Sequence, residues 1–216
     1  MTCFRKTMMH ISAILYLIGA VFSMQVLAGD YAENVTAQKF FKEMEKRHNF
    51  DDSELRKLFS QVYRDQRILD LISKPAEKRL AWRDYREIFL DNARIKNGIK
   101  FWRENENIIS EVSDRSGVPG EIITAIIGVE TRYGKVMGNH RVVSALSTLA
   151  FDYPPRSHFF RKELEAFLLL TREEGKSPLE LKGSYAGAMG YGQFMPSSYR
   201  AYAVDSDGDG KRDIWN

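Results

Sequence analysis

Hydrophobic residues recur every three or four positions over most of the chain, a spacing that is typical of helices. This pattern predicts helical structure over 36–62, from about 92 to 112, over 142–150 and in a long amphipathic stretch after Ser157. No segment shows a convincing alternation of hydrophobic and polar residues, which would mark a half-buried strand. The chain is therefore expected to be mainly α.

Glycine, proline and capping residues indicate where these helices begin and end. Residues 51–53 offer an N-cap within the first segment. Gly117-Val118-Pro119-Gly120 precedes a further, strongly apolar helix, which Gly134 is expected to end. Because aromatic residues at helical spacing usually belong to a core, we interpret Trp82 and Phe89 as core residues.

One carboxylate, Glu130, stands near the end of this apolar helix. Nearly every position between Glu121 and Glu130 is apolar, so the helix is expected to be buried on all sides. Burial would disfavour the charged form of Glu130 and raise its pKa, which suits a general acid near neutral pH. The alternative is a buried structural carboxylate paired with Arg132.

A glycine-rich stretch from 183 to 199 combines backbone freedom with aromatic, hydroxyl and amide side chains. Glycines let the main chain approach a ligand closely. The rings of Tyr191 and Phe194 can stack on sugar faces, and Ser184 and Gln193 can hydrogen-bond to hydroxyl and acetamido groups. The alternative is a structural turn packed on the core.

The first 28 residues have the features of a secretory signal peptide. Two basic residues precede an apolar run from 11 to 22, which is too short to span a bilayer comfortably. We expect cleavage after Ala28, and Asp30 stands where a lipoprotein would carry its lipidated cysteine. The single cysteine, Cys3, would leave with the signal peptide. The mature chain would then have no disulfide, no thiolate metal site, no lipid-anchoring cysteine and no integral membrane span.

Loss of this segment also changes the charge balance. It removes two of the 32 basic residues and none of the 29 acidic ones, which leaves 30 basic against 29 acidic residues. The basic character of the whole chain therefore comes largely from the signal peptide. Since no arginine-rich stripe stands out, nucleic acid is not an expected partner.

Acidic residues at alternate positions near the C-terminal end match the opening of a calcium-binding loop. The sequence predicts Asp205, Asp207 and Asp209 as side-chain ligands, with Lys211 contributing only its carbonyl. Carboxylates this close repel one another unless a cation lies among them. The glutamate usual at the twelfth position is absent, because Asn216 stands there. The alternative is a solvated acidic turn.

Three segments together resemble the lytic murein transglycosylase B family: residues 127–134 (IGVETRYG), 183–199 and 201–205. The resemblance runs from about Trp82 to the last residue. Members of this family are periplasmic enzymes that cleave peptidoglycan between N-acetylmuramic acid (MurNAc) and N-acetylglucosamine (GlcNAc). The resemblance thus implies a lysozyme-like helical core with an added helical region, a periplasmic location and peptidoglycan glycan strands as the partner.

On this basis we expect a signal peptide at 1–28, an N-terminal helical region at 29–115 and a lysozyme-like catalytic core at 116–216. The resembling family continues past the acidic loop with further core and groove residues. The resemblance therefore implies that the C-terminal part of the core is missing from this chain.

The resemblance also assigns roles to single residues. It places the catalytic acid at Glu130, and it identifies Arg156 with one of a pair of groove arginines, the other being replaced by Pro155. Calcium would be structural, and no cofactor would be required for the chemistry. The expected substrate-binding residues are Ser184, Gln193, Tyr85, Arg156, Tyr191 and Phe194.

By resemblance, one carboxylate would act twice. Glu130 would protonate the glycosidic oxygen and then take the proton from the C6 hydroxyl, which closes on C1 to give 1,6-anhydro-MurNAc. The 2-acetamido group can assist by forming an oxazolinium-like intermediate. No water enters the product, so the reaction is a lyase reaction. Two alternatives stay open: a non-catalytic peptidoglycan-binding remnant, and a lysozyme-type hydrolase that would need a second carboxylate.

Overall fold

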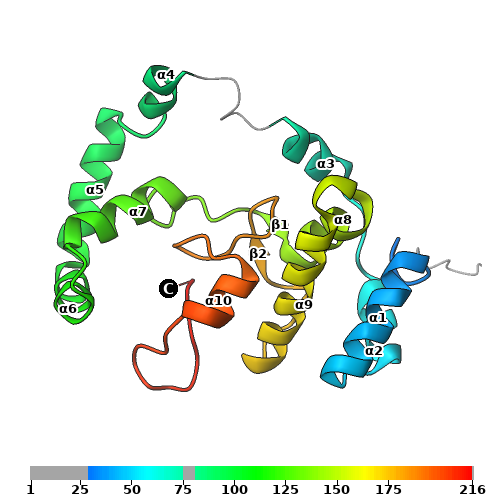
Figure 1. Ribbon diagram of the computed structural model, residues 1–216. Coiled ribbons are helices and arrows are strands. Elements are labelled where there is room, and N and C mark those ends of the chain that lie inside the picture. Colours follow the sequence, from blue (N-terminus) through cyan, green and yellow to red (C-terminus); the bar gives the residue numbers. More distant parts are fainter. Residues whose placement is uncertain (1–28, 75–80, 216) are drawn as a thin grey trace, which may run out of the picture.

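The computed structural model describes residues 29–74 and 81–215 (Figure 1). Over these ranges the chain is mainly helical, which confirms the fold class predicted from the hydrophobic pattern. The predicted signal peptide lies outside the described residues. Among the residues that are described, no helix is both long and apolar enough to cross a membrane.

Helices dominate the element order, and two very short strands interrupt it. The strands are β1 (His140–Arg141) and β2 (Lys182–Gly183), which pair antiparallel with His140 opposite Gly183. The helices are α1 (Val35–His48), α2 (Asp52–Phe59), α3 (Gln66–Ser73), α4 (Trp82–Glu87), α5 (Asn92–Glu104), α6 (Glu106–Ser116), α7 (Gly120–Thr131), α8 (Val142–Asp152), a 3₁₀ helix η2 (Pro154–Arg156), α9 (Ser157–Glu173) and α10 (Pro196–Tyr202).

Capping residues divide the first predicted segment into α1 and α2. The side chain of Asn34 accepts hydrogen bonds from the N–H groups of Thr36 and Ala37, which begins α1. Asn49 ends α1 in the left-handed conformation, with φ of 55°. Asp51 then accepts from the N–H of Glu54 and caps α2, as its sequence position predicts.

Two other predicted boundaries are wrong. The stretch from 92 to 112 is not one helix, because Asn105 leaves the helical conformation between α5 and α6 and donates its side-chain amide to the Phe101 carbonyl. The apolar helix α7 ends at Thr131, before Gly134, because Arg132 and Tyr133 already have positive φ values of 52° and 61°.

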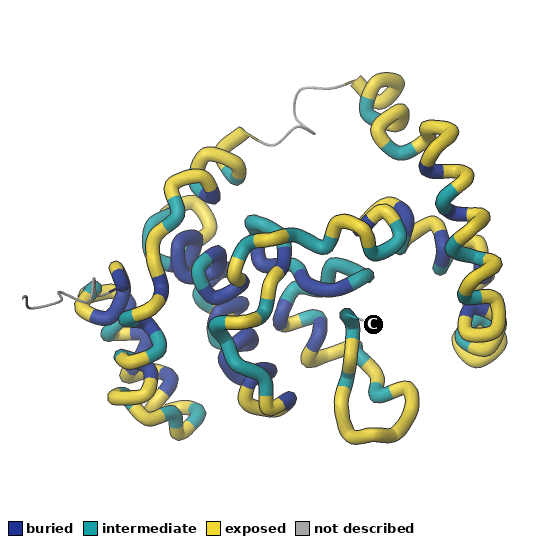
Figure 2. The backbone as a smooth tube through the Cα atoms, turned by 180° about the vertical axis from the view of Figure 1, so that it is seen from behind, coloured by how far each residue is buried: buried dark blue, intermediate teal, exposed yellow. Residues whose placement is uncertain are grey.

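The main body of the molecule comprises α1–α3, α8–α10 and the β1–β2 pair, and it holds most of the buried apolar side chains. Helices α8 and α9 pack against each other, α10 packs on α9, and α3 packs on α8. The core joins side chains from the first three helices to those of α8 and α9, so it draws on both sides of position 116. Figure 2 shows the buried backbone gathered in these helices. The largest fully buried residues of this core include Tyr31, Phe41, Phe59, Phe160, Phe167 and Tyr199.

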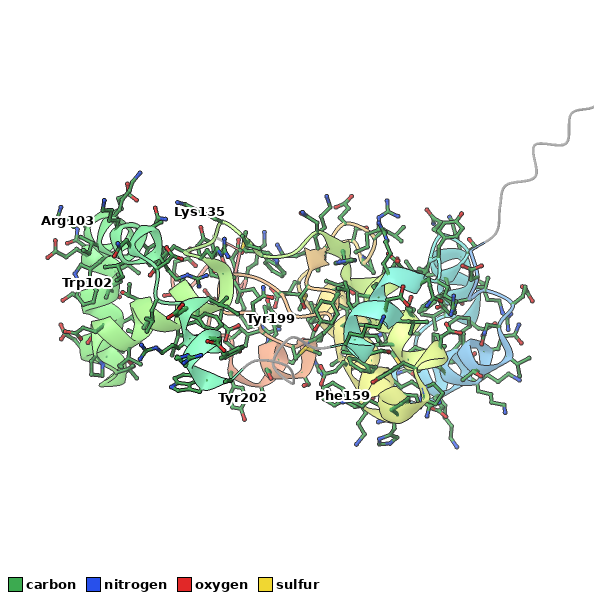
Figure 3. The ribbon with its side chains drawn as sticks, turned by 90° about the horizontal axis from the view of Figure 1, so that it is seen from above. Trp102, Arg103, Lys135, Phe159, Tyr199 and Tyr202 are labelled. Carbon is green, nitrogen blue, oxygen red and sulfur yellow. The ribbon has the colours of Figure 1, made fainter. Side chains whose placement is uncertain are left out.

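Helices α4–α7 form a second unit, here called the helical arm, in which little is buried. Trp82 is 72% exposed, so its interpretation as a core residue is wrong. Phe89 is only partly buried and contacts Tyr85, with ring centroids 5.2 Å apart. The arm lies at one end of the molecule and α1 and α2 lie at the other, as both the front view and the view from above show (Figures 1 and 3). Trp102 and Arg103 mark the arm's end in Figure 3, and Lys135 lies between the two units.

An ion-pair network fixes the C-terminal segment to α9. Arg212 contacts Glu174 and Glu173 at 2.7 and 3.1 Å, and Arg200 contacts Glu173 at 2.7 Å. Tyr199 donates its hydroxyl to the Arg212 carbonyl. The hydrogen bonds from Arg200, opposed by partial burial, hold the pKa of Glu173 below its ordinary value of 4.5. This network places the residues after the acidic loop against α9.

The network should make stability depend on pH. A carboxyl whose pKa is lowered by folding stabilises the fold above its ordinary pKa, and the contribution is lost as the pH falls through the lowered value. We expect Glu173→Gln to lower the urea midpoint at about pH 7, and the difference from the wild type to shrink as the pH falls below the ordinary pKa of 4.5. The control is Glu180→Gln, because Glu180 is exposed and its side chain has no partner among the described residues. An equal effect of both variants at neutral pH would contradict the role of the network.

Candidate active site

Glu130 lies in the last turn of α7 and is exposed. The prediction that α7 is buried on all sides is therefore wrong for the described residues. Only one face of the helix, which carries Gly120, Thr124, Gly128 and Thr131, is buried, and it packs on α5 and α6. The opposite face is open, with Ile126 51% exposed. Ile126 precedes Glu130 by four residues, so the two side chains share a side of the helix.

A buried arginine holds the end of α7 that carries Glu130. Arg94 of α5 is 8% exposed and donates from Nη1 to the Gly128 carbonyl at 2.9 Å. Its guanidinium also lies over the Phe89 ring, 5.3 Å from the centroid. Gly128 itself is needed for this packing, because a Cβ there would lie 2.6 Å from the Tyr133 hydroxyl. Sequence reasoning missed Arg94, since only the fold brings it to the last turn of α7.

Thr131 connects the helical arm to the glycine-rich stretch. Its Oγ1 lies 3.1 Å from the Tyr191 carbonyl and 3.2 Å from the Ile127 carbonyl, and it accepts a hydrogen bond from the Gly134 N–H at 3.0 Å. Thr131 is buried, although its chain neighbour Glu130 is exposed. The hydroxyl therefore fixes the backbone next to the candidate acid. Its position immediately after Glu130 was the available sequence signal, and it was not used.

Tyr191 completes this junction from the other side. A Cβ on Gly134 would lie 2.2 Å from the Tyr191 ring. Only a glycine at position 134 therefore leaves room for the ring. Gly134 also has φ of +79°, which side chains disfavour. The Tyr191 N–H donates to the Ile214 carbonyl at 2.9 Å. The two segments that the sequence singled out are thus in direct contact through this tyrosine.

Ser184 and Gln193 both stabilise the turns of the glycine-rich stretch. Ser184 Oγ accepts a hydrogen bond from the Ala188 N–H at 3.0 Å. Gln193 has a positive φ of 48° and donates Nε2 to the carbonyls of Gly190 at 3.0 Å and Met137 at 3.3 Å. The bond to Met137 joins the stretch to the loop that follows α7. Both side chains are partly exposed, so contact with a ligand is compatible with these bonds.

Phe194 serves the architecture of the same stretch. It forms an isolated antiparallel bridge with Met189, with N···O distances of 2.9 Å in both directions, and its ring packs against the main core. Ser197 adds a second anchor, because the buried carboxylate of Glu163 on α9 accepts from its N–H and its hydroxyl. The structural-turn interpretation of this stretch is therefore correct in part.

Two of the predicted substrate-binding residues lie outside this junction. Tyr85 belongs to α4 and contacts the rings of Trp82 and Phe89. Arg156 ends η2, and its guanidinium lies 4.4 Å from the Phe159 ring centroid. The described contacts of these two residues include none with the α7 end or the glycine-rich stretch. Their grouping with Glu130 stays a prediction.

The segments around Glu130 offer no second carboxylate at a suitable distance. Between 117 and 151, and again between 183 and 199, Glu121 is the only other acidic residue. It lies at the opposite end of α7, about 13 Å away along the helix axis. A nucleophilic carboxylate in a retaining glycosidase lies only about 5 Å from the acid. These segments therefore supply one acid and no carboxylate nucleophile.

The acidic loop has the donor set for a hard cation. One carboxylate oxygen from each of Asp205, Asp207 and Asp209 lies within 4.8 Å of the others. Asp205 also accepts hydrogen bonds from the N–H groups of Gly208 and Gly210, and these bonds lower its pKa. Three carboxylates held this close fit a calcium ion, which prefers oxygen ligands.

Comparison with known proteins identifies the family. The family description "Transglycosylase SLT domain" matches residues 32–216. The chain is 44% identical over 210 residues to the membrane-bound lytic murein transglycosylase B of Escherichia coli (strain K12), which covers 93% of this chain and 58% of the relative.

Solved structures agree with this assignment. The soluble lytic transglycosylase SltB1 from Pseudomonas aeruginosa is 54% identical, with a TM-score of 0.79 over 83% of this chain and 60% of that one. The Escherichia coli lytic transglycosylase Slt35 in complex with calcium is 46% identical, with a TM-score of 0.81 over 90% and 62%. The chain spans about three fifths of the length of these relatives. With nearly its whole length matched, this chain belongs to the lytic murein transglycosylase B family of transglycosylase SLT domain proteins.

Proposed function

We propose that this protein is a lytic murein transglycosylase, a lyase that cleaves the MurNAc–GlcNAc bond of peptidoglycan and leaves a 1,6-anhydro-MurNAc end. The observation that carries the proposal is the junction of Glu130, Thr131 and Tyr191. Thr131, the residue after Glu130, contacts Tyr191 of the glycine-rich stretch, and this stretch offers a tyrosine, a hydroxyl and an amide. Membership of the family supports the same reaction class.

Glu130 would act as the single acid and base. Its carboxyl would give a proton to the glycosidic oxygen, and the resulting carboxylate would take one back from the C6 hydroxyl. Because Glu130 is exposed, a sugar ring must itself displace water from the carboxyl group. The open apolar side chain of Ile126, on the same side of α7, would support a ring in that position.

The neighbouring polar groups would orient the substrate. The side chains of Ser184 and Gln193 form hydrogen bonds within their own turns, which fix their positions. Their other donor and acceptor positions would then bind the substrate in a defined orientation. Tyr191 would offer a ring beside Gly134, and Phe194, Tyr85 and Arg156 would extend the groove. We further propose the division at residue 116 between a helical region and a lysozyme-like core, and a periplasmic location reached through the signal peptide.

A non-catalytic peptidoglycan-binding role is the second candidate. The exposure of Glu130 favours it, because the described residues do not enclose its carboxyl group, whereas closing an active site normally expels water from the reacting groups. Digestion of purified sacculi followed by mass spectrometry separates the possibilities. Anhydro ends support the proposed lyase, reducing ends indicate a hydrolase, and binding without release indicates the non-catalytic role.

The first prediction about the proposed function concerns the acid. Glu130→Gln should lower the release of anhydro-muropeptides from sacculi by at least about 10²-fold, because the amide neither donates nor accepts the transferred proton. The fold should be unchanged, since the side chain is exposed. Glu121→Gln, at the other end of the same helix, is the matched control and should turn over like the wild type. Retention of most activity by Glu130→Gln would remove the residue from the acid role.

The second prediction concerns the turn residues. Ser184→Ala and Gln193→Ala should each reduce turnover, but less than Glu130→Gln does. Ser184→Ala should also lower stability by about 1 kcal/mol, because the Ala188 N–H loses its acceptor. Chemical denaturation and the sacculus assay, with Ser110→Ala on the exposed surface of α6 as control, measure both effects. A loss as severe as that of Glu130→Gln in a folded variant would place Ser184 or Gln193 in the proton transfer.

The third prediction concerns the metal. We propose that Asp205, Asp207 and Asp209, with the Lys211 carbonyl, hold a structural calcium ion that takes no part in bond cleavage. A ligand that binds only the folded state stabilises it by about 2.7 kcal/mol at a hundred times its dissociation constant. Calcium should therefore raise the melting temperature, and chelation should reverse the shift. Asp207→Asn/Asp209→Asn should abolish it, whereas Asp114→Asn on α6 should not. No shift would leave the loop as a solvated acidic turn.

A further inference from the structure

A groove between α1 and α9 lies on the main body, away from the candidate active site. Its volume is about 530 Å³, which is within the range of pockets that bind small ligands. The helical arm that carries Glu130 and the helix α1 lie at opposite ends of the molecule (Figures 1 and 3). A ligand in this groove would therefore not contact the α7 end.

The groove is lined by an excess of positive charge. Five lysine and arginine residues line it, against the two glutamates Glu43 and Glu165. Glu165 is already occupied, because it pairs with Arg47 at 3.0 Å and with His48 at 2.7 Å. Arg200, also in the lining, pairs with Glu173.

This pairing leaves three cations without an acidic partner among the described residues: Lys39 on α1, and Arg161 and Lys162 on α9. Glu43, one turn after Lys39 on α1, is the one carboxylate of the lining that is likewise unpaired within the described part of the chain. Because the whole mature chain is almost electrically balanced, this surplus is a local feature of the groove rather than a general property of the surface.

The lining also has an apolar part. Phe40, Ala166 and Leu169 belong to the lining and are themselves buried, at 3%, 7% and 6% exposure. The lining thus combines unpaired cations with buried apolar side chains. Such a surface complements a short chain that carries both carboxylates and alkyl groups. A flat bilayer surface would not reach into a groove between two helices.

We propose that the α1/α9 groove binds the carboxylate-bearing peptide stems of peptidoglycan and so holds the protein on its substrate outside the catalytic centre. The proposal rests on the proposed function, which supplies peptidoglycan as the substrate. Lys39 and Lys162 line the groove from the two helices and would meet the carboxylates of the ligand. Many stems on one sacculus would add to the binding of the glycan by raising the effective concentration of the protein.

The test measures binding of a stem pentapeptide, labelled at its N-terminus, to the full chain by fluorescence anisotropy. The double charge reversal Lys39→Glu/Lys162→Glu should weaken binding about tenfold, since each reversal replaces an attraction by a repulsion at a partly solvated site. The matched control, Lys42→Glu/Lys46→Glu, changes the net charge equally on exposed positions of α1 that are not in the lining. It should bind like the wild type. Amidation of the peptide carboxylates should abolish binding, and added salt should weaken it.

Sacculus co-sedimentation in the Glu130→Gln background repeats the comparison on the polymer without cleavage. Equal binding of pentapeptide by the charge-reversal variant and the wild type would overturn the proposal. Charge-dependent binding to vesicles of anionic phospholipid, without binding to the peptide, would also overturn it and assign the groove to a membrane surface. Failure of the proposed function would look different, because the wild type would then release no anhydro ends while its peptide binding was intact.

Discussion

A small contact fixes the position of the helical arm relative to the main body of the molecule. The main body has a conventional apolar core, whereas the helical arm buries little. Between them, Thr131 reaches the Tyr191 carbonyl, and Gly134 allows the Tyr191 ring to approach the backbone. This contact, together with the hydrogen bond from Gln193 to the Met137 carbonyl, fixes the end of α7 relative to the glycine-rich stretch. Glycine is required at position 134 both by its φ and by the space that the ring occupies.

Close contacts between glycines and aromatic side chains hold the helices of the arm together. Gly98 and Gly128 lie so close to Tyr133 that a Cβ on either would lie under 3 Å from its hydroxyl. The buried guanidinium of Arg94 satisfies a helix carbonyl beside this contact. An arm held in this way keeps its shape with one helix face open to solvent. That open face is the one that carries Ile126 and Glu130.

The sequence predicted the helical class and the long helix α9, because both depend on local hydrophobic periodicity. It also predicted the cap at Asp51, because a capping side chain lies next to the backbone that it caps. It also predicted the two segments that meet at the junction. It failed on burial, since an apolar run shows that a helix can be buried and not that a partner covers it. Trp82 and the face of α7 that carries Ile126 are exposed, although both belong to apolar patterns. Arg94 was invisible to motif reasoning, because its role depends on a contact 34 residues away along the chain.

The acidic loop and the junction are connected through the chain that follows the loop. The carbonyl of Ile214 accepts a hydrogen bond from the Tyr191 N–H, and Ile214 packs against Gly190. Arg212 binds the carboxylates of Glu173 and Glu174 at the end of α9. Any cation that orders the loop therefore also favours one position of the Tyr191 backbone. By thermodynamic linkage, a ligand that holds Tyr191 in place would in turn raise the affinity of the loop for the proposed calcium ion. The affinity of the acidic loop for the proposed ion would then report whether a ligand is bound beside Tyr191.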